Sequence, residues 1–174
     1  QGDWSSDVCS SDLNYDVRAE WFPNPGDFVM LSLFSKKIQS PIEAVNLGSI
    51  DSVFNEDSAT IYGMEIELNK KLSEWGPFLQ DITLGFNYAK MFSQVQLTDF
   101  SAANRRNAGF PDSRALQGQP DYTMNFNATY DNEDFGFSLG VFLNITGELL
   151  YQVGGVTGSS ISPDVVQETY TRLD

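Results

Sequence analysis

Hydrophobic and polar residues alternate one by one along most of this chain. Successive side chains of a β-strand point to opposite faces, so each alternating run predicts a strand with one apolar and one polar face. Six such runs cover residues 15–22, 29–36, 62–69, 82–89, 122–130 and 135–146. A seventh begins near Val166 and runs to the end of the chain, and the 3.6-residue period of an amphipathic helix is not sustained over any useful length. The chain is therefore expected to be all-β.

The connections between these runs alternate strictly between short and long. The short ones are residues 23–26, 73–79 and 131–134, and the long ones are roughly 38–59, 93–116 and 147–165. In an up-and-down arrangement of antiparallel strands, all short turns then lie at one end and all long loops at the other. Membrane-spanning β-barrels have this asymmetry, and strands of about 10 residues tilted by ~45° match their apolar band of about 25 Å.

Charged and aromatic residues sharpen the prediction. The charged residues within the runs lie on the polar side, whereas Lys70 and Lys90 lie on the apolar side near run ends, where a long stem reaches the interface. Aromatic residues gather near the ends of the apolar faces, as at lipid–water interfaces: Tyr15, Trp21, Tyr62, Tyr88, Tyr122, Tyr130 and Phe135. We predict a partial antiparallel up-and-down transmembrane β-barrel, about six to seven strands of a larger barrel. A soluble β-sandwich would show the same alternation, but it does not explain the long loops.

Composition removes several classes of function. The chain has 174 residues, 24 acidic and 10 basic side chains, a net charge of −14, one cysteine and no histidine. Catalytic triads, histidine-based metal sites and disulfide frameworks are thereby excluded from this segment. The acidity argues against nucleic acid as a partner. We expect no catalytic residue, no metal site and no cofactor, so the chain is not predicted to be an enzyme.

The first residues resemble translated laboratory sequence. Residues 3–13, Asp-Trp-Ser-Ser-Asp-Val-Cys-Ser-Ser-Asp-Leu, match one reading frame of a common short-read sequencing adaptor. We expect residues 1–13 to be an adaptor-derived artefact outside the fold, as with other non-native scars. Residues 14–174 are then expected to be a fragment of a barrel, truncated at both ends.

Four sequence blocks carry a resemblance to a known family. Residues 61–68 resemble a "YGxExE" strand, and residues 114–125 resemble an "RxLxGQPxYxxN" segment that leads into a strand. Residues 34–43 resemble "FxKxIxxPIE", and residues 163–166 with 173–174 resemble a late-barrel segment. The blocks span most of residues 14–174 in the order found in the β-barrel of TonB-dependent outer-membrane receptors.

That resemblance implies a location, partners and a task. The whole protein would lie in the outer membrane of a Gram-negative bacterium, with outer-membrane lipid around it. Its own plug domain and TonB, through segments missing from this chain, would be partners. It would import a scarce nutrient, such as a siderophore, cobalamin, an oligosaccharide or a peptide. The alternatives are a plain porin or channel barrel and a secreted, soluble β-sandwich that binds glycans.

One cluster is a candidate for ligand contact. Arg105, Arg106 and Arg114 concentrate positive charge in the second long loop of an otherwise acidic chain. Guanidinium groups bind anions such as a ferric siderophore or lipid phosphates. Charges that are solvated or paired with other loops explain the same residues. Glu65 and Glu67, two positions apart on one face, are expected to line the interior.

Overall fold

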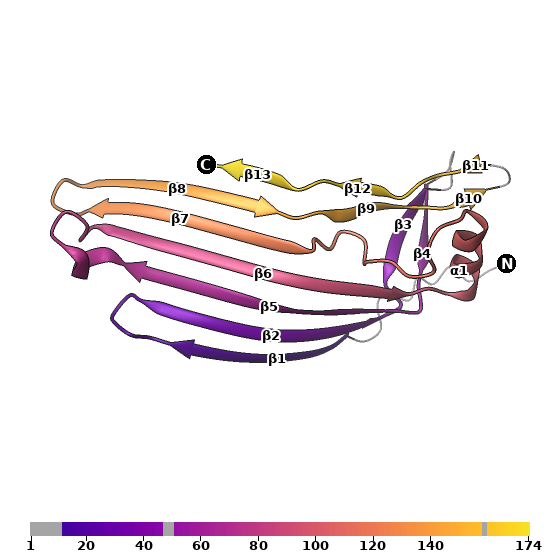
Figure 1. The fold of residues 1–174 in the computed structure, drawn as a ribbon, viewed down its shortest axis with the longest axis horizontal. Helices are drawn as coiled ribbons and strands as arrows, with labels where there is room; N and C mark the ends of the chain where they lie inside the picture. The colour runs from indigo at the N-terminus through magenta and orange to yellow at the C-terminus, as the bar shows by residue number, and fades with distance from the viewer. Residues whose placement is uncertain (1–11, 47–50, 158–159) are drawn as a thin grey trace.

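The computed structural model describes residues 12–46, 51–157 and 160–174, and its main feature is one long antiparallel sheet (Figure 1). The sheet has seven strands in the order β1-β2-β5-β6-β7-β8-β13, so neighbours in the sheet follow one another along the chain. The strands are β1 (Asp12–Trp21), β2 (Phe28–Gln39), β5 (Ser58–Lys71), β6 (Ile82–Gln96), β7 (Tyr122–Asn132), β8 (Phe137–Thr146) and β13 (Tyr170–Leu173). The predicted all-β, up-and-down architecture is confirmed, and the sheet is open, with β1 and β13 at its edges.

Short and long connections separate as predicted. Residues 22–27, 72–81 and 133–136 form the short ones, which meet at what we call the turn end. Residues 40–57, 97–121 and 147–169 form the first, second and third long connections, which meet at the long-loop end (Figure 1). The 3-10 helix η1 (Leu72–Trp75) lies in one of the short turns. This separation follows from antiparallel pairing, because each strand reverses the direction of the one before it.

The long connections are more ordered than the sequence predicted. They contain β3 (Ile42–Asn46), β4 (Asp51–Asn55), helix α1 (Asp99–Asn107), β9 (Leu149–Gly154), β10 (Val156–Thr157), β11 (Ser160–Ile161) and β12 (Val165–Gln167). A second sheet has the order β12-β9-β3-β4, in which β3 and β9 run parallel, so the first and third connections are joined by backbone pairing. We call the three long connections together the loop cap. A small apolar cluster of Val45, Leu150 and Val153, with Phe54 against it, stabilises the loop cap.

The remaining differences lie at strand ends. The sixth run starts at Phe137 rather than Phe135, because Gly136 turns with a φ of 61° and Phe135 N donates to Asn132 Oδ1 at 2.9 Å. The seventh run divides into β12 and β13, which belong to different sheets. Strand β1 includes Asp12 and Leu13, which pair with Ile38 and Lys37. The rest of the segment attributed to an adaptor lies outside the described residues, and its origin stays a prediction.

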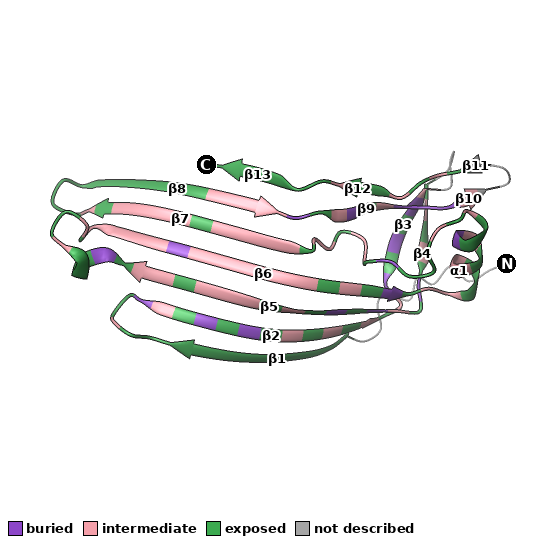
Figure 2. Cartoon of the chain, in the orientation of Figure 1, coloured by how far each residue is buried: buried purple, intermediate pink, exposed green. Residues whose placement is uncertain are grey.

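Strand register sorts the side chains onto two faces. One row across all seven strands reads Ala19, Leu31, Ile66, Tyr88, Met124, Ile145 and Thr171, and we call its side the outer face. The next row reads Glu20, Met30, Glu67, Asn87, Asn125, Asn144 and Arg172, on the inner face. Large apolar side chains of the outer face remain exposed, such as Val17 at 72% and Leu139 at 56% (Figure 2). No second layer of the described residues covers this face, as a second sheet would in a β-sandwich.

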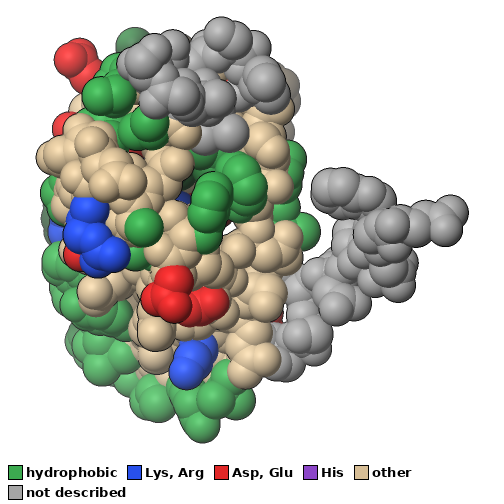
Figure 3. All heavy atoms as spheres, turned by 90° about the vertical axis from the view of Figure 1, so that its right-hand side faces the viewer, with side chains coloured by type: hydrophobic (Ala, Val, Ile, Leu, Met, Phe, Trp, Pro, Cys, Tyr) green, Lys and Arg blue, Asp and Glu red, His purple; other side chains and the backbone are tan. Residues whose placement is uncertain are grey.

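Aromatic pairs lie near both ends of the outer face. Tyr62 and Phe92 stack with centroids 5.4 Å apart, and Tyr88 and Tyr122 lie 6.3 Å apart towards the long-loop end. Tyr130 and Phe137, 6.2 Å apart, lie towards the turn end. From the long-loop end, hydrophobic side chains are visible along one curved margin of the molecule (Figure 3). Among residues 12–46, 51–157 and 160–174, no helix is long and apolar enough to cross a membrane.

Candidate functional site

The three arginines predicted as ligand contacts lie in the second long connection, but they face different surroundings. Thr98 begins helix α1, and its hydroxyl accepts a hydrogen bond from Ser101 N at 3.3 Å. Near the end of that helix, Arg105 is buried and its neighbour Arg106 is exposed. Arg114 follows in a segment held beside β6, where Val95 N donates to Arg114 O at 3.0 Å. Its side chain is also buried.

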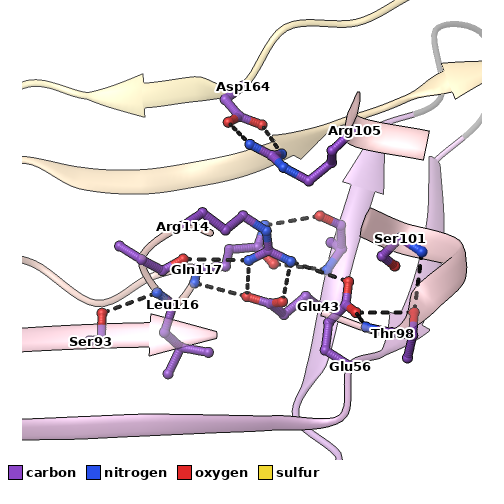
Figure 4. Close-up of polar contacts among 12 residues, drawn as sticks. Glu43, Glu56, Ser93, Thr98, Ser101, Arg105, Arg114, Leu116, Gln117 and Asp164 are labelled. Carbon is purple, nitrogen blue, oxygen red and sulfur yellow. Dashed lines mark hydrogen bonds and ion pairs between the residues drawn. The ribbon is translucent and has the colours of Figure 1, made fainter. Parts of the chain in front are cut away.

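Arg105 ties the helix to the third long connection. Its Nη1 and Nη2 donate to the two oxygens of Asp164, each at 2.9 Å, and its Nε donates to Pro111 O at 3.0 Å (Figure 4). Asp164 also accepts from Gly154 N at 2.8 Å. Burial raises the pKa of Asp164, but the hydrogen bonds from Arg105 and Gly154 outweigh it and leave that pKa below its usual value. Asp164 is therefore a charged anchor for the guanidinium.

Arg114 ties the second connection to the first. Its Nη1 and Nη2 donate to Glu43 Oε1 at 2.8 Å and Oε2 at 2.5 Å, and Nη2 also reaches Glu56 Oε1 at 3.4 Å (Figure 4). Glu56 accepts a further bond from Thr98 N at 2.9 Å. All three charged side chains are at least 96% buried. Two carboxylates thus share one guanidinium. The guanidinium of Arg114 is buried against them and is not accessible to a ligand from solvent.

Gln117 connects all three long connections. Its backbone N donates to Glu43 Oε1 at 3.0 Å, while its side-chain oxygen accepts from Ala44 N at 2.8 Å. Its side-chain nitrogen donates to Tyr151 O at 2.8 Å. Beside it, Leu116 N donates to Ser93 Oγ at 3.0 Å, which fixes this segment against β6 (Figure 4). We call Glu43, Glu56, Arg114 and Gln117 the loop clasp.

Arg106 stands apart from the loop clasp. Its side chain is 59% exposed and pairs with the exposed Asp112 at 3.0 Å. The structure therefore does not bring the three arginines together as one positively charged surface: two are buried against carboxylates, and the third lies at the surface. Their role in ligand contact stays a prediction. The sequence does contain both halves of the clasp, Glu43 in the "PIE" block and Arg114 in the "RxLxGQP" block, but spacing along the chain does not show that they meet.

The inner face carries a hydrogen-bonded row of polar side chains. Arg18 Nε donates to Ser32 Oγ at 3.2 Å, and Asn87 donates to Glu65 Oε1 at 2.5 Å. Asn125 donates to Asn87 Oδ1 at 3.3 Å, and Asn144 donates to Asn125. We call these residues the inner polar row. Glu65 and Glu67 face inward as expected, and Glu65 is a hydrogen-bond acceptor in this row. Amides and charges that satisfy one another across strands suit a wet interior.

The turn end has its own charged anchor. Asp27, in the turn before β2, is buried and accepts from Lys70 Nζ at 2.6 Å, Lys71 N at 2.8 Å and Asn24 Nδ2 at 3.1 Å. The hydrogen bond from Lys70, and then that from Lys71 N, lowers the pKa of Asp27 to about 2. The first turn is thereby fixed to the end of β5, a strand with which it shares no loop.

Comparison with known proteins agrees with this geometry. The family described as "TonB dependent receptor-like, beta-barrel" matches residues 13–174. The FrpB iron transporter of Neisseria meningitidis has a similar fold, with a TM-score of 0.54 and 11% identity over 92% of this chain and 22% of that one. Two mutants of the ferric enterobactin receptor PfeA of Pseudomonas aeruginosa are also similar, each with a TM-score of 0.53, 17% identity and the same coverage.

No curated protein matches the chain. The chain spans 22% of the length of the solved structures above, and these likenesses concern the fold. The match of the family to residues 13–174 covers nearly the whole sequence. The open antiparallel sheet, with its apolar outer face and its polar inner face, agrees with this match. The chain belongs to the TonB-dependent receptor family, as part of its β-barrel.

Proposed function

We propose that the whole protein is an outer-membrane receptor that takes up a scarce nutrient with energy delivered by TonB. The observation that carries this proposal is the separation of apolar and polar side chains onto opposite faces of the seven-stranded sheet. The chain's membership of the TonB-dependent receptor family supports the same proposal. The outer face is apolar between two aromatic borders, as lipid contact requires, and the inner face is polar. The protein is then a transporter rather than an enzyme.

Its orientation follows from the two ends. In bacterial barrels, short turns face the periplasm and long loops face the outside. The turn end with Asp27 and η1 is accordingly periplasmic, and the loop cap with the loop clasp is extracellular. A plug domain, on a segment outside this chain, would meet the inner polar row, whose amides offer both donors and acceptors.

The related structures suggest the first ligand to test. One is described as an iron transporter and the other as a ferric enterobactin receptor. A ferric siderophore is therefore the leading candidate, and Arg106 is the only one of the three arginines whose guanidinium is exposed in the described loops. Cobalamin, oligosaccharides and peptides form the comparison set, because the loop cap contains hydrogen-bonding groups that suit any of them.

Uptake by cells tests the proposal. A deletion strain that expresses the full-length gene is compared with the same strain without TonB, using labelled ferric siderophores, cobalamin, oligosaccharides and peptides. We expect one ligand class to accumulate only when both the receptor and TonB are present. Accumulation that persists without TonB would instead support a plain channel. A protein recovered in the soluble fraction would contradict the membrane location itself.

A further inference from the structure

The wall formed by the sheet is interrupted between β6 and the segment that leads into β7. Met91 N donates to Asp121 O at 3.0 Å, just beyond the last pair of β6 with β7. Further towards the long-loop end, Val95 N donates to Arg114 O at 3.0 Å. Between these two bonds β6 advances four positions and the facing segment advances seven, and no backbone hydrogen bond joins the two stretches, all of which the structure describes. The segment therefore bulges away from β6.

This segment pairs with the third long connection instead. Gly118 N donates to Leu150 O at 2.8 Å, and Asp121 N donates to Glu148 O at 3.0 Å. Pro120, between them, has no amide hydrogen to offer to either neighbour. In Figure 1 the segment winds between β6 and β9 before β7 begins. The interruption thus lies on the β6 side of the segment.

A cavity of about 830 Å³ lies at the interruption. The strand residues that line it come from both faces of the sheet. Tyr62, Phe92 and Gln94 belong to the outer face, and Met91 and Ser93 belong to the inner face. A volume of this size falls within the range of small-molecule sites. The cavity is therefore placed across the wall rather than on one surface of it.

Gln119 and Met91 separate this cavity from the interior. Gln119 Nε2 donates to Met91 Sδ at 2.9 Å, and both side chains are half-buried. Both also line a second cavity, of about 430 Å³, together with the inner-face residues Phe34, Lys36 and Ile61. A thioether sulfur is a weak acceptor, and both side chains are long and flexible. One weak contact between two mobile side chains thus divides the two cavities.

The outer mouth of the first cavity lies at the aromatic border. Phe92 and Tyr62, which line it, stack with their centroids 5.4 Å apart. Lys90 Nζ lies 5.4 Å from the centroid of the Phe92 ring. Aromatic rings beside a lysine are typical of the level at which hydrocarbon meets headgroups. An amphiphile in the membrane would accordingly hold its polar head level with this mouth.

The charges of the lining disfavour an anion. The charged residues that line the first cavity are Arg114, Asp121, Glu148 and Asp164. Ion pairs compensate Arg114, Asp121 and Asp164. Glu148 is exposed and has no charged partner among the described residues. The cavity therefore presents a net negative charge, which favours an uncharged or cationic group.

We propose that the interruption is a lateral entrance through the barrel wall, by which an amphiphile in the outer leaflet reaches the interior. Its ligand class is a molecule with one hydrocarbon chain and an uncharged or cationic polar head. Phe92, Leu149 and Val166 of the lining suit the chain, whereas Ser93 and Gln119 suit the head. This inference rests on the proposed function, because it requires a transporter whose outer face meets lipid.

Access from the membrane tests the entrance. The full-length receptor, with its native cysteines replaced by serine, is reconstituted in phosphatidylcholine vesicles. Met91→Cys and Ala89→Cys place thiols on the same face of β6, and Ala89 is the matched control because β6 pairs with β7 there without interruption. A maleimide on a long alkyl chain, which concentrates in the membrane, should label Met91→Cys about tenfold faster than Ala89→Cys. A sulfonated, water-soluble maleimide should label both at similar rates. Equal labelling of both positions by the alkyl reagent would overturn the inference.

Variants of Gln119 test the separation of the two cavities. In the Met91→Cys receptor, Gln119→Trp should abolish the advantage of the alkyl reagent, because the indole ring fills the space beside residue 91. Gln119→Ala should increase that advantage, and neither substitution should change the labelling of Ala89→Cys. If neither substitution altered the labelling of Met91→Cys, Gln119 would not close an entrance.

Competition tests the ligand class. An alkylamine and an alkyl glucoside with the same chain, at the same membrane concentration, should slow the labelling of Met91→Cys, and an alkyl sulfate should slow it much less. Equal protection by the sulfate would overturn the assigned head group. TonB-dependent nutrient uptake is recorded for the same variants in cells. A receptor that transports but shows no advantage of Met91→Cys contradicts the entrance alone, whereas an inserted receptor that transports none of the ligands contradicts the proposed function.

Discussion

Glu43 and Arg114, 71 positions apart in the chain, form a buried ion pair with two hydrogen bonds, at 2.8 and 2.5 Å. One residue comes from β3 in the first long connection and the other from the second, so the pair holds two loops of the cap together. Removal of one partner from a buried pair leaves an uncompensated charge, which is far more destabilising than the loss of an exposed pair.

Arg114→Gln should loosen the loop cap and leave the barrel strands intact. We expect a local cost of about 3–5 kcal/mol, because Glu43 and Glu56 would remain buried without a cation. Hydrogen exchange of the full-length receptor should show faster exchange in residues 40–46 and 113–121 but unchanged exchange in β7. Arg106→Gln is the control, with an expected cost of at most about 1 kcal/mol. Unchanged exchange in the cap of Arg114→Gln would contradict the clasp.

Phe126 and Asn125 are neighbours on β7 that face opposite sides of the sheet. Phe126→Arg places a cation in the middle of the outer face and should destabilise the receptor in lipid by about 2–4 kcal/mol. Asn125→Arg places the same charge on the inner polar row and should cost clearly less. Denaturant unfolding from vesicles measures both. If the two variants were equally stable, or Asn125→Arg were worse, the assignment of the two faces would be wrong.

The stability of the turn end should depend on acid through Asp27. Its pKa in the folded protein is about 2, below the usual value of about 4, so ionised Asp27 favours the folded state. This contribution is complete above about pH 4 and is lost as the pH falls through about 2. The melting temperature of the full-length receptor should therefore fall over that range, and Asp27→Asn should lack this part of the decline.

Glu74→Gln is the matched control for that measurement. Glu74 contacts the same lysine, Lys70, but at 3.4 Å and with a side chain that is 55% exposed. Its loss should change little, because exposed pairs contribute little to stability. A Glu74→Gln variant that reproduced the full effect of Asp27→Asn would assign the acid dependence to Lys70 and its surroundings as a whole.

The sequence was sufficient for the sheet but not for the loop cap. Alternation from Tyr62 to Asn69 or from Ile82 to Ala89 is a local pattern, and the seven strands of the long sheet lie side by side in the order in which they occur along the chain. The cap depends on contacts between three separate connections. The five residues of β3 or β4 are too few for alternation to stand out, and the parallel pairing of β3 with β9 joins Val45 to Val153 across most of the chain.

The candidate arginines show the same limit. Their charge and their place in a long loop were evident, but whether a guanidinium faces solvent or a carboxylate depends on where the other loops lie. Arg105 and Arg106 are adjacent in sequence, yet one is buried against Asp164 and the other is exposed. The direction of α1 and the position of the third connection beside it distinguish them, and the sequence predicted neither the helix nor that position.

Gln117 contacts all three long connections through its backbone and both atoms of its amide. A single surface loop transplanted from a relative would therefore meet partners from two other loops. In this barrel, a first connection without Glu43 and Glu56 would leave Arg114 buried without its carboxylates, and a third connection with another backbone path would move the carbonyl of Tyr151 away from Gln117. These three loops should therefore be exchanged between relatives as one set, together with the segment from Arg114 to Gln117.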